Sequence, residues 1–186
     1  MIKKIVNTKP KKYLQQGIRH CGSYTIKAIL SAYNLDDGRH PKKYLSSKMK
    51  SFGFTTPKLI QETLKHYGFD APTNRVNKFS NDNKIKAIKK EVDKNHPVIL
   101  LIGNGYSPTG KYSKLRMNFL SHWISIWGYD DKKKVFFIYD SYVDPTCYDK
   151  IPVGNIKRTY EQVLRDWKGV FYFRIKSFVY MPVIKR

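Results

Sequence analysis

Apolar residues in the first half of the chain recur every three or four positions, which predicts helices with one buried face. Thr56 and Gly68 delimit the clearest of these segments, because Thr56 can cap a helix that starts at Pro57 and Gly68 can end it. Pro41 suits the first turn of a shorter helix. The predicted helices cover residues 21–33, 41–51, 57–67 and 82–94.

The second half of the chain changes to strand-like patterns, rich in β-branched and aromatic residues. A basic turn between two alternating segments predicts a hairpin. Thr159 and Gln162 predict a capping box for a helix that runs through Trp167. Helices followed by an antiparallel sheet indicate the α+β class. The predicted strands cover residues 97–103, 122–130, 135–142 and 170–183, the last as one strand or a pair.

The length of 186 residues fits one domain, 1–186, with residues 1–14 as an extended arm. No internal repeat or low-complexity linker divides it. No apolar run reaches the roughly 18 residues of a membrane span, so no transmembrane segment is expected. The basic N-terminus lacks the apolar stretch of a signal peptide, which leads us to expect a cytoplasmic protein.

The charge balance is strongly basic, with 36 Lys and Arg against 14 Asp and Glu, a net charge of +22. Such a field attracts nucleic acid and other polyanions. The basic residues are dispersed along the chain, however, which favours solvated lysines on every face over one binding patch. Contact with a polyanion therefore remains an alternative role of the charge.

Two cysteines, Cys21 and Cys147, are too few for a disulfide framework or a structural zinc site. Cys147 follows Pro145 in a predicted loop with no candidate base, so we expect a free thiol without a catalytic role. Cys21 opens a predicted helix, where the helix dipole and unpaired N–H groups favour the nucleophilic thiolate. By itself, a cysteine at the start of an apolar helix face is also typical of a plain core.

The predicted hairpin brings a candidate base and a candidate orienting carboxylate close together. His122 opens one strand and Asp140 closes the next, so both side chains should lie at the same end of the sheet. Asp140 can then accept from one imidazole nitrogen and leave the other facing a thiol. Gln15, six residues before Cys21, can donate to an oxyanion together with the Cys21 N–H, with Gln16 as its local competitor.

The order and spacing of these residues resemble the papain-like cysteine peptidases. The likeness is greatest to the branch of bacteriocin-processing, double-glycine-leader peptidases and their stand-alone relatives. It rests on QQGIRHCG, which contains Gln15 and Cys21, on HWISIWGYDD, which starts at His122, and on FFIYDS, which contains Asp140. The same order of helices and strands extends the resemblance over most of residues 13–175.

Two departures from that branch stand near the motifs. Ser141 occupies a position that often holds Pro, and His20 precedes the cysteine where an acidic residue is common. The resemblance implies a papain-like fold with N-terminal helices packed on a C-terminal antiparallel sheet. It also implies a thiol-dependent peptidase that acts on a peptide or protein through an acyl-enzyme at Cys21 and requires no metal or organic cofactor.

Two other functions are alternatives to the peptidase. An acyltransferase or transglutaminase-like enzyme would keep the triad and replace water with an amine or thiol. A catalytically silent basic binding module would instead use the loop-like stretch LIGNGYSPTGKYSKLRMNF, in which aromatic and basic residues alternate and can meet bases and phosphates. An intact Cys21–His122–Asp140 geometry would argue for the enzyme, and a steep salt dependence of nucleic-acid binding would argue for the module.

Overall fold

The computed structural model describes residues 2–17, 19–45, 55–144, 151–170 and 177–186. Its fold is α+β, as predicted. The helices are α1 (Cys21–Ala32), the 3-10 turn η1 (Pro41–Lys43), α3 (Pro57–His66), α4 (Asn81–Asp93), α5 (Lys114–Phe119) and α6 (Tyr160–Trp167). The strands are β1 (Lys3–Ile5), β2 (Phe69–Asp70), β3 (Asn74–Arg75), β4 (Val98–Gly103), β5 (Ser121–Asp130), β6 (Val135–Tyr139), β7 (Ile156–Thr159), β8 (Val179–Pro182) and β9 (Ile184–Lys185).

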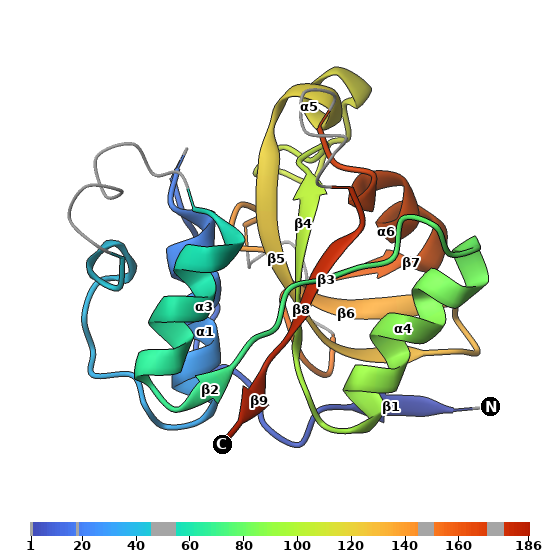
Figure 1. Cartoon of the computed structure of the whole chain (residues 1–186). Coiled ribbons are helices and arrows are strands. Elements are labelled where there is room, and N and C mark those ends of the chain that lie inside the picture. Colours follow the sequence, from blue (N-terminus) through green and yellow to red (C-terminus); the bar gives the residue numbers. More distant parts are fainter. Residues whose placement is uncertain (1, 18, 46–54, 145–150, 171–176) are drawn as a thin grey trace.

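The main sheet is antiparallel, with strand order β3-β8-β4-β5-β6-β7, and β1 pairs with the distal end of β5. In Figure 1, α1 and α3 lie to the left of these strands, and α4 and α6 lie to the right. α1 packs against β5, whereas α4 and α6 contact β4 and β5 between them. Since β5 and β6 are buried almost throughout, they read as nearly continuous apolar runs.

Local signals explain where the helices start. The Thr56 side chain accepts from the Leu59 N–H at the start of α3, and Pro57 is the first helical residue. At α6, Thr159 and Gln162 form the predicted capping box, with each side chain accepting from the other's backbone N–H. Gly68, which follows α3, has φ near 82°, a left-handed conformation that suits glycine.

Several predicted elements differ from the structure. The stretch before His122 is not all loop, because Ser113 caps α5 and starts a short helix at Lys114. The predicted arm contains β1, which pairs with β5. The predicted helix over 41–51 appears only as η1, and the rest of that segment falls outside the described residues. The last predicted strand is β8, with residues 171–176 likewise outside the description.

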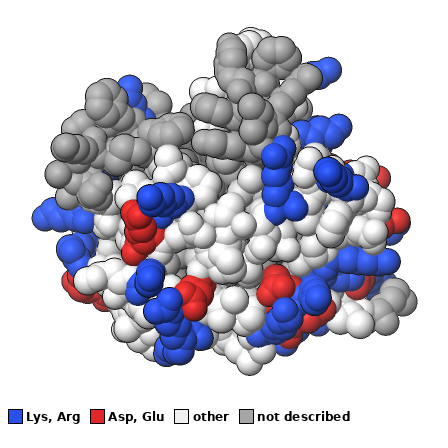
Figure 2. Space-filling view, viewed as in Figure 1, with Lys and Arg blue, Asp and Glu red and all other residues white. Residues whose placement is uncertain are grey.

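The surface carries charge of both signs. On the face shown in Figure 2, Lys and Arg are spread among Asp, Glu and uncharged residues and are not gathered in one patch. Among the described helices, none has the length and apolarity that a membrane crossing requires.

Candidate active site

Cys21 is the first residue of α1 and is partly buried, with a free thiol. His20 directly before it adopts a left-handed backbone conformation, with φ 80° and ψ 19°. Histidine is one of the few residues other than glycine that is enriched in this region. This turn brings the chain abruptly into α1 and leaves the thiol at the helix N-terminus, where the dipole favours an anion.

Gly22 allows the start of α1 to pack closely against Thr55. A Cβ on Gly22 would lie 2.5 Å from Thr55 Cγ2, which is too close for any real contact. Thr55 is fixed in turn, because its carbonyl accepts from Trp123 Nε1 at 3.0 Å. Trp123 is the neighbour of His122 on β5, so the same contacts connect the start of α1, with Cys21, to the strand that carries His122.

His122 lies at the start of β5, opposite Ile102 of β4, and its side chain is 2% exposed. Its Nε2 is 2.7 Å from Oδ1 of Asp140. The imidazole also forms a hydrogen bond with Cys21. Because Nε2 is taken by the carboxylate, that second bond uses Nδ1. One imidazole therefore bridges the thiol and the carboxylate, as the hairpin argument predicted.

Asp140 directly follows β6 and is fully buried. The register pairs Ser125 with Tyr139, so Asp140 lies diagonally across from His122 on the neighbouring strand, on the same face of the sheet. Its Oδ1 also accepts from the Tyr142 N–H at 2.9 Å. Its backbone is held by Asn155, whose side chain bonds both the N–H and the C=O of Asp140 at 2.8 Å.

Burial and neighbouring charge shift the pKa of His122 in opposite directions, and the same is true of Asp140. Burial alone lowers the pKa of His122, but the charge of Asp140 and the hydrogen bonds to Asp140 and Cys21 outweigh it and raise the pKa to about 9. Burial raises the pKa of Asp140, and the positive charges of His122 and Arg158 more than offset it, so the pKa falls well below its usual range. At neutral pH the pair is therefore imidazolium and carboxylate.

Gln15 and Gln16 lie on the segment before α1 and differ in exposure. Gln16 is buried, its side chain accepts from the Ser141 hydroxyl, and its N–H donates to the Ser141 carbonyl at 2.7 Å. Gln15 is exposed. Leu14, the residue before Gln15, is also held in place, because its carbonyl accepts a hydrogen bond from the Tyr139 hydroxyl at 2.7 Å. The oxyanion role of Gln15 stays a prediction. Cys147 lies outside the described residues.

One residue of the site was missed by sequence reasoning. Arg158 of β7 is 1% exposed and its Nη2 donates to Oδ2 of Asp140. The signal was weak, because a charged residue in IKRT hides the alternation that would mark a strand. Across the described residues, no three His, Cys, Asp or Glu side chains gather in a way that holds a metal ion.

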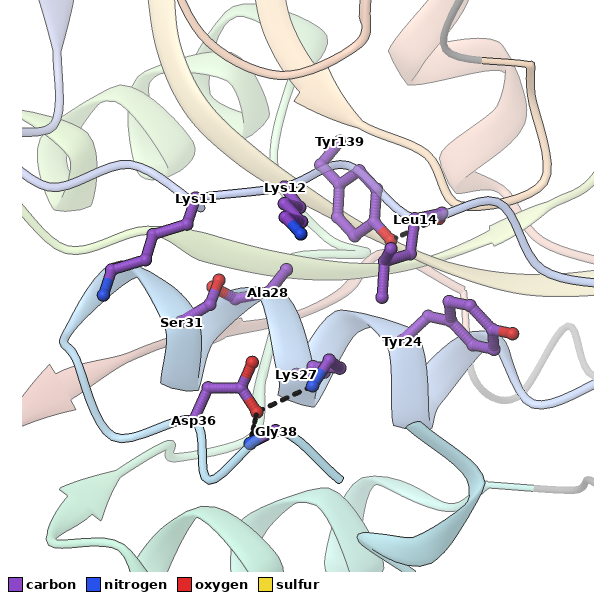
Figure 3. A pocket seen from close by; sticks show the side chains of 10 residues that line it. All are labelled: Lys11, Lys12, Leu14, Tyr24, Lys27, Ala28, Ser31, Asp36, Gly38 and Tyr139. Atoms are coloured by element: carbon purple, nitrogen blue, oxygen red, sulfur yellow. Dashed lines mark hydrogen bonds and ion pairs between the residues drawn. The ribbon is translucent and has the colours of Figure 1, made fainter. Parts of the chain in front are cut away.

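A cavity of about 320 Å³ lies beside the site and is bordered by the segment before α1 and by α1 itself. Figure 3 shows Lys11, Lys12 and Leu14 on one side and Tyr24 and Lys27 on the other. The Lys27 ammonium faces Asp36 at 2.7 Å and is thus already paired. Tyr139, next to Asp140, also lines the cavity, but none of the triad residues does. The cavity therefore does not contain the thiol, the imidazole or the carboxylate.

Several solved structures share this architecture. A putative C39-like peptidase from Bacillus anthracis has a TM-score of 0.59 and 13% identity, over 100% of this chain and 99% of that one. The peptidase domain of Streptococcus ComA, a bifunctional ABC transporter, has a TM-score of 0.55 and 17% identity, over 98% of both chains. A double glycine motif protease from an AMS/PCAT transporter, solved with its leader peptide, has a TM-score of 0.54 and 14% identity over the full length of both.

Among curated protein sequences none matches. The family model described as the Peptidase C39 like family matches residues 7–168, which include Cys21, His122, Asp140 and Gln15. The match covers far more than half of the chain and agrees with the fold and with the sequence resemblance. The chain therefore belongs to the Peptidase C39 like family and is a cysteine peptidase of the papain-like superfamily.

Proposed function

We propose that this peptidase cleaves peptide bonds through an acyl-enzyme at Cys21, with His122 as general base and acid and Asp140 orienting and charging His122. The observation that carries the proposal is the single imidazole shared between the Cys21 thiol and the Asp140 carboxylate. A nucleophile, a base and an orienting group within hydrogen-bond reach are what acyl transfer requires.

The cycle follows from these contacts. Cys21 Sγ attacks the substrate carbonyl carbon, and a C–S bond forms. His122 gives the proton on Nδ1 to the leaving amine nitrogen, and the C–N bond breaks. His122, now neutral, takes a proton from water, whose oxygen attacks the acyl carbon and breaks the C–S bond. The Gln15 side-chain amide and the Cys21 N–H stabilise the oxyanion in both steps.

The proposed substrate is a peptide or a protein. The transporter protease solved with its leader peptide supports a peptide ligand for this fold. The alternating aromatic and basic stretch is a weak candidate for binding polyanions, because two of its members are engaged internally. The Arg165 guanidinium stacks on Tyr112 at 3.7 Å, and Arg116 bonds the Tyr142 hydroxyl at 2.9 Å. Polyanion contact and a cytoplasmic location stay predictions from the sequence.

The test is the rate of iodoacetamide labelling at each cysteine against pH, mapped by mass spectrometry. At pH 6.5 a free thiol is only about 1% ionised, so an ion-paired Cys21 should react about tenfold faster than Cys147 or more. His122→Ala should slow Cys21 labelling strongly, and Asp140→Ala should slow it less because the base remains. Cys147→Ser should keep peptidase activity, and Cys21→Ser should lose it.

The opposite result is equally clear. Superimposable labelling curves for the parent and both variants, with a midpoint near 8.5, would mark Cys21 as an ordinary thiol and end the proposal. Product analysis with and without an added amine then separates hydrolysis from acyl transfer to an amine, since only transfer gives an amide product.

A further inference from the structure

Arg158 lies behind the Asp140 carboxylate, on the side away from His122. The two carboxylate oxygens are divided between different partners: Oδ1 serves His122 and the Tyr142 N–H, whereas Oδ2 serves Arg158. Arg158 and Asp140 are 1% and 0% exposed, so water offers neither of them a comparable interaction. The carboxylate is therefore held between an imidazole on one side and a guanidinium on the other.

The guanidinium is enclosed by an aromatic and acidic cluster. Its Cζ lies 4.2 Å from the centre of the Tyr106 ring. Buried Asp166 of α6 is also close enough for the charge of Arg158 to lower its pKa, although burial raises that pKa overall. Asp166 is paired with Arg165 of the same helix at 2.9 Å. Two cations thus alternate with two anions from Arg165 to Asp140.

Arg158 is costly as a purely structural residue. Its Nε and Nη1 are buried and find no hydrogen-bond partner in the described part of the chain. An unsatisfied buried N–H costs about 1–3 kcal/mol. Apolar residues often replace a buried ion pair at no loss of stability. The cost therefore points to a use for the charge beyond holding the sheet together.

The catalytic cycle supplies that use. His122 must pass from imidazolium to neutral imidazole and back in every turnover. When His122 is neutral, Asp140 loses the charge of its closest partner and becomes a buried anion. Isolated buried carboxylates are so unfavourable that they take up a proton. The positive charge of the Arg158 guanidinium then offsets the anion.

We propose that Arg158 is a positioning residue that keeps Asp140 ionised and turned toward His122 after His122 has released its proton. The inference rests on the proposed function, because it assigns Arg158 a part in the cycle of His122. It is also a property of the resting protein, so it can be measured without a substrate. The charged and titratable groups that face Asp140 and Arg158 are Cys21 of α1, Tyr106 after β4, Arg116 of α5, His122 of β5, Tyr139 of β6 with Tyr142 after it, and Arg165 and Asp166 of α6.

The experiment is a pH titration of His122 in the full chain by ¹⁵N-histidine NMR, with the His122 signals identified by their absence in His122→Ala. Arg158→Gln keeps a hydrogen-bond donor for Oδ2 and removes the charge. Without the charge of Arg158, the imidazolium is the main countercharge of Asp140, so His122 should hold its proton more tightly. The midpoint should rise by about one pH unit above the parent value.

Three comparison variants separate charge from packing. Arg158→Lys keeps a cation, so its midpoint should lie closer to the parent than to Arg158→Gln. Arg165→Met removes a cation that is bound to Asp166 and not to Asp140, so it should lower thermal stability without moving the midpoint. If Arg158→Gln does not fold, Arg158→Met replaces it, with the same expected shift.

An unchanged or lower midpoint in a folded Arg158→Gln chain would overturn the inference, as would an equal rise in Arg165→Met. These outcomes differ from a failure of the proposed function. That failure appears in the parent as an ordinary labelling curve for Cys21, whatever the His122 titration shows.

Discussion

His122 and Asp140 lie at the same end of two neighbouring central strands and are almost fully buried, whereas Cys21 begins a helix behind an irregular segment and is partly exposed. The strand pair is fixed by register, by Asn155 and by Arg158. The side of Cys21, the proposed nucleophile, depends on close packing at Gly22 and on a left-handed turn at His20, and the strand pair carries the proposed base, His122. The base side should therefore respond most to changes of charge, and the nucleophile side to changes of shape.

The largest expected effect is on the base side. Asp140→Ala leaves Arg158 as a buried, uncompensated cation and should lower the free energy of unfolding by about 3–5 kcal/mol. Asp70→Ala is the matched control, because Asp70 also pairs with an arginine, Arg186, but both side chains are about half exposed. The control should lose about 1 kcal/mol or less. Equal losses in urea unfolding would remove the distinction between the two regions.

Gln15 and Gln16 give the next test, on the nucleophile side. Gln15→Ala should lower kcat about 10²-fold if its amide stabilises the oxyanion, and should leave iodoacetamide labelling unchanged. Gln16→Ala should instead cost about 1 kcal/mol of stability, because the buried Ser141 hydroxyl loses its acceptor. The assay uses the peptide that the parent cleaves best in a degenerate library. A kinetic loss in Gln16→Ala alone would transfer the oxyanion role to Gln16.

Gly22→Ala tests shape without charge. The added Cβ meets Thr55 at 2.5 Å and should lower stability by about 1–3 kcal/mol through overpacking. Gly17→Ala, on the same side of the site, meets nothing within 4 Å and should be close to neutral. Thermal unfolding of both variants is the measurement. A neutral Gly22→Ala would mean that the start of α1 adapts and is held less tightly than the close contact implies.

The sequence predicted best what local signals determine. The capped helices α3 and α6, the apolar strand β4 and the hairpin of β5 and β6 follow from periodicity and from residues such as Thr56 and Thr159. The hairpin also placed His122 beside Asp140. The short strands β2, β3 and β9 were missed, because two-residue strands are defined by distant partners such as Lys185 for Phe69 and not by their own pattern.

The sequence motifs lead to Cys21, His122 and Asp140, whose catalytic roles stay predictions. Arg158 lies outside any motif, and its role depends on a fold that brings β7 beside β6. The sequence predicts a loop where α5 lies, because a helix of six residues is too short to show a repeating pattern of apolar positions. The sequence also cannot tell which of Gln15 and Gln16 is buried, since that depends on which amide reaches Ser141 in the fold. The extent of the domain, 1–186, stays a prediction.

The smallest effect is a slope, and it tests whether the two sides share a proton at rest. Folding raises the pKa of His122 from 6.5 to about 9, so the folded state holds one extra proton between these values. That contribution to stability is fully present below pH 6.5 and is lost as pH rises through about 9. In Cys21→Ser the part of this shift that Cys21 supplies is lost and the part that Asp140 supplies stays, so stability should fall between pH 7 and 8 by at most about 1.4 kcal/mol per pH unit. In the parent, a folded thiolate–imidazolium pair binds as many protons as an unfolded thiol and neutral imidazole, so the slope should be near zero.

The measurement is urea unfolding of both chains at several pH values, which gives the slope of the free energy of unfolding against pH. All other titrating groups contribute equally to the two slopes, so they cancel when the slopes are compared. Cys147→Ser should keep the parent slope, and a parent slope as steep as that of Cys21→Ser would show that the thiol keeps its proton in the resting enzyme.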